Sequence, residues 1–165
     1  MGARQPWFDD IDLEALTELF RRQDLRGSFS LATIGWNHTE KVTSRFVDRL
    51  KVPRRVRRAA TALARWGRQL IEPSKLGSEG FLEHLQGIGA FRNGDGADDV
   101  FSLIESCEKI DLSELRYFAQ ELAGLKITGV EGRAYGKALR TARVEMIEKT
   151  SHKRFMSLVS RSAAR

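Results

Sequence analysis

The feature that most constrains the fold is a run of apolar and small side chains between residues 53 and 71 that recurs at the spacing of one helical face. Pro53 opens this run, and proline suits the first turn of a helix because the N–H it lacks would have no partner there. The spacing therefore predicts a helix buried along one side. The buried stripe is expected to contain Val56, Ala59, Ala60, Leu63, Ala64, Gly67, Leu70 and Ile71.

The opposite side of this helix is rich in arginine. At about 100° per residue, the positions opposite the stripe are Arg54, Arg58, Thr61, Arg65 and Arg68, with Arg55 and Arg57 beside them. No acidic residue lies between Arg54 and Gln69, and like charges one turn apart repel each other. An anionic partner would relieve this repulsion, and RNA suits it because neutralising several phosphates releases counterions. A solvated face neutralised by carboxylates such as Asp48 or Glu72 remains the alternative.

Charge and composition indicate which kinds of partner and which cellular compartment to expect. The net charge of +6 and the pI of about 9.8 favour contact with nucleic acid or an acidic surface. No apolar run approaches the roughly 20 residues that cross a bilayer, and the first residues lack the apolar core of a signal peptide. Cys107 is the single cysteine, which excludes an internal disulfide and suits a reducing compartment. We expect a cytoplasmic or organelle-matrix protein with no membrane partner.

Helical spacing recurs along the rest of the chain, and no internal repeat or strand alternation accompanies it. We expect an all-α fold, an irregular multi-helix bundle of about seven helices. An amphipathic helix should follow Asp9 and Asp10, and residues 29–34 favour a short helix over an extended segment. The expected caps of later helices are Asn37 or Thr39, Ser78, and Asp111 or Ser113.

The expected organisation has four parts. Residues 1–35 form an N-terminal helix and junction, 36–110 a helical body with the basic helix, and 111–149 the tail helices. Residues 150–165 are expected to form a basic arm, although Phe155, Leu158 and Val159 also fit a short helix.

The last long helix carries a second basic face. Arg133, Lys137 and Arg140 lie opposite an apolar face of Tyr135, Ala138, Leu139, Ala142 and Met146. The turn from Gly129 to Gly132 precedes it, so free N–H groups at the helix start could take a phosphate, although Glu131 would compete for the same place. Two basic faces without an obvious aromatic platform favour phosphate and 2′-hydroxyl contacts on an A-form duplex over base reading.

The sequence indicates no reaction centre. His38, His84 and His152 are far apart, and no HExxH, CxxC, GxSxG or phosphate-loop motif is present. The segment RNGDGADD lacks the ligand spacing and terminal Glu of a calcium loop, so a turn leading into a helix near Ala97 is the better interpretation. Cys107 lies on an apolar helical face with no nearby histidine to activate it. We therefore predict no catalytic residue, no metal site and no cofactor.

Three blocks in a fixed order carry a resemblance to a known family. They are WNHTEKVTSRFVDRLKVPRRVRRAATALARW, FLEHLQGIGAFRNGDGADDVFSLIESCEK and GLKITGVEGRAYGKALRTARVEMI. Together they resemble the C-terminal half of the bacterial CCA-adding tRNA nucleotidyltransferases and their poly(A) polymerase relatives, over roughly residues 36–148. The matching pieces are Leu50 to Pro53, Ala90 to Arg92, Cys107-Glu108, and Gly129 to Gly132 followed by Lys137, Leu139 and Arg140.

The resemblance implies a helical body and tail that hold tRNA, without the separate head that adds nucleotides from CTP and ATP. Residues preceding His38 contain no His-Asp pair, so the metal phosphohydrolase site of some family members is not expected. The sequence thus predicts a non-catalytic RNA-binding module for tRNA, acting alone or with a separate nucleotidyltransferase catalytic chain. A scaffold component of a larger ribonucleoprotein or protein complex, or a degenerate phosphohydrolase, are the alternatives. The residues predicted to contact RNA are Arg54, Arg55, Arg57, Arg58, Arg65, Arg68, Lys126, Gly129, Gly132, Arg133, Lys137 and Arg140.

Overall fold

The structure is a computed structural model that describes residues 32–92, 94 and 96–161, and most of these residues are helical. The all-α fold predicted from the helical spacing is confirmed. The helix predicted after Asp9 and Asp10 lies outside the described residues. In chain order the elements are α3 (Ile34–Asn37), α4 (Glu40–Arg49), α5 (Arg54–Ala62), the π-helical turn η2 (Leu63–Gly67), α6 (Arg68–Leu70), the 3-10 turn η3 (Pro73–Lys75), α7 (Gly77–Ile88), α8 (Gly96–Glu108), β1 (Ile110–Asp111), α9 (Ser113–Gly124), α10 (Arg133–Lys149), α11 (His152–Ser157) and β2 (Ser160–Arg161).

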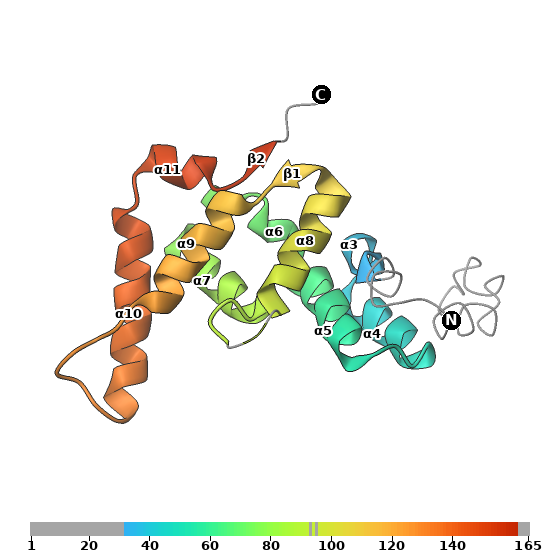
Figure 1. Cartoon of the computed structure of the whole chain (residues 1–165), viewed down its shortest axis with the longest axis horizontal. Coiled ribbons are helices and arrows are strands. Elements are labelled where there is room, and N and C mark those ends of the chain that lie inside the picture. The colour runs from blue at the N-terminus through green and yellow to red at the C-terminus, as the bar shows by residue number, and fades with distance from the viewer. Residues whose placement is uncertain (1–31, 93, 95, 162–165) are drawn as a thin grey trace, which may run out of the picture.

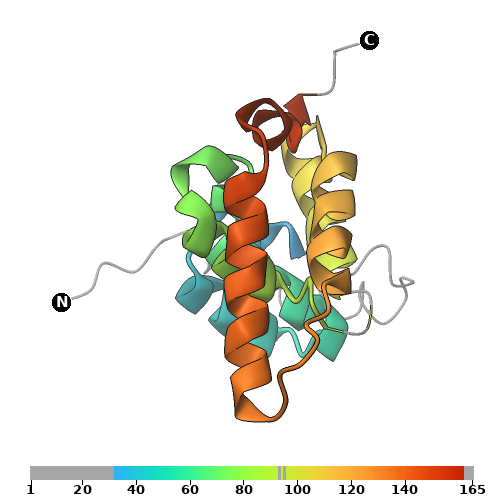
Figure 2. The same cartoon turned by 90° about the vertical axis from the view of Figure 1, so that its left-hand side faces the viewer.

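The helices form a bundle in which the middle of the chain lies between its two ends. Figure 1 shows α3, α4 and α5 at one end and α10 along the opposite flank, with α7, α8 and α9 between them. Figure 2 looks onto that flank and shows α10 in front of the other helices. None of the described helices is long and apolar enough to cross a membrane.

The stripe predicted for the arginine helix is the centre of the core. Val56, Ala60, Leu63 and Leu70 are fully buried, and the remaining predicted positions of the stripe are buried or half-buried. They join one continuous cluster with the large side chains of the following helices, such as Phe81, Phe101 and Phe118. Burying a side chain of this size contributes about 1.5–3 kcal/mol. This burial fixes which side of α5 faces outward.

One close approach to α5 and two hydrogen bonds, to α8 and α6, hold the start of the described chain in the bundle. A Cβ atom added to Gly35 would lie 2.3 Å from the backbone oxygen of Ala60, so only glycine permits this packing of α3 on α5. Trp36 then donates its indole N–H to the Glu108 carboxylate at 2.7 Å. Arg68 Nε donates to the Trp36 carbonyl oxygen at 2.8 Å. Glycine thus allows the contact, and two long-range hydrogen bonds fix it.

The helix ends agree only in part with the predicted caps. Thr39 caps α4, because its side-chain oxygen accepts the Val42 N–H. Ser78 was expected to cap α7, and this prediction is wrong: α7 begins at Gly77 with no side-chain cap. Asp111 accepts hydrogen bonds from the Ser113 N–H and hydroxyl, next to the start of α9. These bonds lower the pKa of the Asp111 carboxyl, the side-chain bond most.

The segment after α10 is not the basic arm that was expected. Its described part forms α11, with Leu158 fully buried and Phe155 edge-to-face on Phe81 at 5.2 Å. Arg154 pairs with Glu121 of α9. The chain then runs into β2, which pairs antiparallel with β1 (Figure 1). Phe155, Leu158 and Val159, spaced at i, i+3 and i+4, pack in or against the core of the same chain. This burial favours a packed helix over a loose basic arm.

The apolar face predicted for α10 is also shifted. Its buried residues are Arg143 and Ile147, whereas Ala138, Leu139 and Met146 are only half-buried. Arg143 Nε donates to the Leu122 carbonyl oxygen at 2.8 Å, and its guanidinium lies 4.1 Å from the Phe91 ring centroid. Burial lowers the pKa of Arg143 from its ordinary value. Arg143 of α10 therefore contacts the last turn of α9 from a buried position outside the predicted apolar face.

Two glycine-to-alanine substitutions should have opposite effects on stability. Gly35→Ala should lower the free energy of unfolding by about 1–3 kcal/mol, because the new methyl group would collide with backbone of α5. Gly136→Ala should raise it by about 0.5–1 kcal/mol, because this position lies within α10 and faces open space. Urea unfolding followed by circular dichroism measures both, and equal effects would contradict the close packing of α3 on α5.

Candidate functional site

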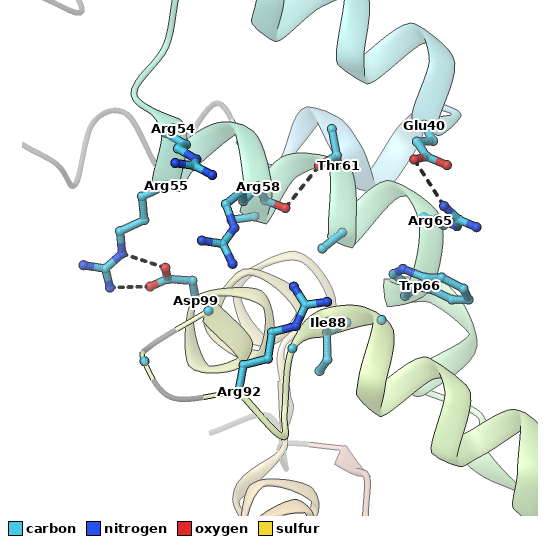
Figure 3. A pocket seen from close by; sticks show the side chains of 16 residues that line it. Glu40, Arg54, Arg55, Arg58, Thr61, Arg65, Trp66, Ile88, Arg92 and Asp99 are labelled. Atoms are coloured by element: carbon cyan, nitrogen blue, oxygen red, sulfur yellow. Dashed lines mark hydrogen bonds and ion pairs between the residues drawn. The ribbon is translucent and has the colours of Figure 1, made fainter. Parts of the chain in front are cut away.

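An open groove of about 620 Å³ runs between α5 and the segment that joins α7 to α8. Arginines of α5 form one wall, and Arg92 approaches from the opposite side (Figure 3). Most of the other lining residues are small or apolar, and Glu40 and Asp99 are the two carboxylates among the described lining residues. The remaining described lining comprises Glu40, Ala59, Thr61, Ala62, Trp66, Gly87, Ile88, Gly89, Gly94, Gly96 and Asp99.

The end of α7 determines where Arg92 lies. Gly89 has a φ of 90°, a left-handed conformation that suits glycine. Its N–H bonds to the Gln86 carbonyl and the N–H of Ala90 bonds to the Leu85 carbonyl, which is the hydrogen-bond pattern of a glycine-terminated helix. A further turn, from the Arg92 N–H to the Gly89 carbonyl, then brings Arg92 back toward α5.

The outer arginines of the groove are paired with carboxylates of other helices. Arg55 makes two bonds of 2.7 Å to the carboxylate of Asp99 on α8. Arg65 lies 3.6 Å from Glu40 of α4, with both side chains about half exposed, so this pair contributes little. The alternative of neutralisation by other helices is therefore correct for these two arginines. It also holds for Arg57, which pairs with Asp48 at 2.9 Å.

Three inner arginines have no such partner within the described part of the chain. Arg54 and Arg58 extend from α5, and Arg92 extends toward them from the far side (Figure 3). No described carboxylate forms an ion pair with any of the three. The same three side chains line a second recess next to the groove, together with Val52 and Arg57. Positive charge is thus concentrated between the two recesses.

The other end of the groove is aromatic. Trp66 is half-buried, and the Arg65 guanidinium lies 4.6 Å from its ring centroid. His84 meets the ring edge-to-face at 5.0 Å. A Cβ atom on Gly87 would lie 2.4 Å from the ring, so glycine is needed where α7 passes it. Gly87 lies inside α7 and makes room for Trp66.

The predicted RNA-contacting residues do not all meet at one place. Arg54, Arg55, Arg58 and Arg65 line the groove, and Arg57 lines the adjoining recess. Arg68 is turned to the Trp36 backbone instead, because the π-helical turn η2 interrupts the regular period on which the predicted ridge was based.

The second basic face reaches the groove at one point. Arg140 bonds to Gln86 at 3.3 Å, one residue before Gly87 of the groove wall. Arg133 and Lys137 continue this exposed face toward the start of α10. Lys126, Gly129 and Gly132 lie in the loop before α10. Both glycines have positive φ and open space at the Cβ position.

Two groove residues were missed by the sequence prediction of contacts. Arg92 stands alone after a helix, and only the Gly87-Ile88-Gly89 pattern signalled a turn that could bring it toward another element. Trp66 contradicts the expectation that no aromatic platform accompanies the arginines. Its ring lies between the buried stripe and the arginine side, a position that the helical period left undecided.

Within the described residues, no group of three or more His, Cys, Asp or Glu is placed to hold a metal ion. His84 bonds through Nδ1 to the Gly80 carbonyl and packs on Trp66, which is a structural role. Cys107 is half-buried, and burial, followed by the nearby Glu108 charge, raises the pKa of its thiol. Burial thus disfavours the reactive thiolate form of Cys107.

Comparisons with known proteins give no match: no protein-family model matches the sequence, no curated protein is similar to it, and no solved structure matches it.

The raised pKa predicts that Cys107 reacts slowly with alkylating agents. At pH 7.4 iodoacetamide should modify the native protein more slowly than it modifies free cysteine, because the reactive thiolate is scarce. The rate should rise as the pH is raised, and unfolding in urea should restore the rate of free cysteine. Mass spectrometry measures the single site, since the chain has one cysteine. Fast native modification would contradict the raised pKa.

Proposed function

We propose that this protein is a non-catalytic RNA-binding module whose groove between α5 and Arg92 takes the sugar-phosphate backbone. The observation that carries the proposal is the convergence of Arg54, Arg58 and Arg92, three guanidinium groups without a described carboxylate partner. Like charges held close together raise the free energy of the unliganded site, and a bound phosphate removes that cost.

Arginine is suited to this role because its planar group donates several hydrogen bonds in a fixed geometry that matches phosphate oxygens. The net charge of +6 favours association with a polyanion over a range of distances. The exposed face of Arg133, Lys137 and Arg140 starts beside the groove wall at Gln86, so further phosphates have a surface to follow.

Transfer RNA is the first RNA to test. The three sequence blocks that resemble the CCA-adding nucleotidyltransferases are the reason, since the body and tail in that family hold tRNA. On this proposal a separate polypeptide supplies any nucleotide addition, because the two carboxylates that line the described groove, Glu40 and Asp99, are both paired with arginines and do not form a pair that could bind two magnesium ions.

Charge reversal inside the groove should weaken RNA binding. Wild-type protein should retain labelled tRNA on a filter, with affinity that falls as salt rises. Arg58→Glu combined with Arg92→Glu should lower the affinity at least tenfold and reduce the slope of log affinity against log salt by about 1 for each lost phosphate contact. These two residues test the groove better than Arg65, which already has Glu40 as a partner.

Arg45→Glu combined with Arg49→Glu is the matched control. It makes the same change of charge at two exposed positions of α4 that do not line the groove. Circular dichroism should give the same helical signal for all variants. Equal weakening by the control would mean that only net charge matters, and unchanged retention by the double variant would reject the groove as the site.

A further inference from the structure

The groove has two chemically different ends, and this division points to one kind of ligand. Figure 3 shows Arg54 and Arg58 toward one end and Trp66, with Arg65 beside it, toward the other. Arg92 reaches the space between them. A ligand that fills the groove must therefore carry a strong anion and a flat, largely apolar group close to each other.

The aromatic end offers flat and uncrowded surfaces. Ala62 and Gly87 have little or no side chain, and Ile88 is buried below the surface. Arg65 lies over the Trp66 ring, and its side chain is 55% exposed, so a planar group can stack on the guanidinium or take its place on the indole. The weak 3.6 Å contact with Glu40 opposes such a movement only slightly.

The distance between the two ends suits a single nucleotide. Arg58 and Ala62 are one helical turn apart, about 6 Å along the axis of α5. A phosphate beside Arg58 and a ring beside Ala62 can therefore belong to one nucleotide or to neighbouring ones. The groove volume of about 620 Å³ lies within the range of pockets that hold small ligands. A groove of this volume cannot enclose both strands of a duplex.

We propose that the groove binds a single-stranded stretch of RNA, with an unpaired base stacked on Trp66 and Arg65 and its phosphate held between Arg58 and Arg92. This inference rests on the proposed function and deepens it, because it replaces contact with a duplex by contact with unpaired nucleotides. Positive grooves that follow the backbone, combined with aromatic side chains for the bases, bind single strands with little preference for sequence.

Three fluorescein-labelled probes test the inference at one salt concentration: a six-nucleotide oligoadenylate, a six-unit abasic strand with the same phosphates, and a blunt RNA duplex of 12 base pairs. Fluorescence anisotropy should give an affinity for oligoadenylate at least about fivefold above that for the abasic strand. The duplex should bind no better per strand than the abasic probe. An abasic strand or duplex that binds as well as oligoadenylate would overturn the inference.

Tryptophan emission gives a second readout that does not depend on affinity. Unlabelled oligoadenylate should quench the emission of the wild-type protein, because a stacked base contacts the Trp66 indole. The quenching should be lost in Trp66→Phe, which keeps an aromatic ring in the groove and leaves the buried Trp36 as a reporter of folding. Quenching that persists in this variant would place the base elsewhere.

A steric variant separates this inference from the proposed function. Ala62→Gln adds bulk at the half-exposed aromatic end without changing charge, and it should weaken oligoadenylate binding while leaving the abasic strand unaffected. If Arg58→Glu with Arg92→Glu abolishes tRNA retention but Ala62→Gln changes neither probe, the inference fails and the proposed function stands. If the wild-type protein retains no RNA, both fail.

Discussion

The structure depends on the burial of one side of α5. A helix that places Val56, Ala60 and Leu63 in the core must present its other side to solvent, and in this chain that side is arginine. Substituting the arginines would leave the core intact, whereas loss of the buried stripe would remove the surface on which they are arranged. Packing of the buried stripe therefore decides where the arginines lie, whereas the arginines contribute little to the packing of the core.

The neighbouring helices divide the arginines into two kinds. Carboxylates from α4 and α8 reach Arg57, Arg65 and Arg55, and these arginines line the groove or its adjoining recess. Asp99, with its side chain only 12% exposed, holds the Arg55 guanidinium on two bonds. The Asp99 pair thus keeps Arg55 in place, whereas the exposed pairs of Arg57 and Arg65 reduce the repulsion only slightly. The remaining positive potential is focused on Arg54, Arg58 and Arg92.

Periodicity was sufficient to predict the helices, the buried stripe and four of the groove arginines, because one repeated spacing determines all three. It could not predict the π-helical turn at Leu63–Gly67, since a single extra residue per turn leaves no mark on an apolar pattern this short. Arg68 was placed in the wrong direction for this reason. Arg92 and the course of α11 depend on long-range contacts, with α5 and with Phe81 respectively, and local spacing contains no information about such contacts.

The two halves of α10 are supported very differently. Arg143 and Ile147 are buried in its second half, whereas no residue between 133 and 142 is buried, and Figure 1 shows the first half extending along the edge of the bundle. Burial therefore anchors α10 through its second half, whereas its first half is held by half-buried side chains and by the bond from Arg140 to Gln86. Any displacement of α10 should cost least at the end near Arg133, where no side chain is buried.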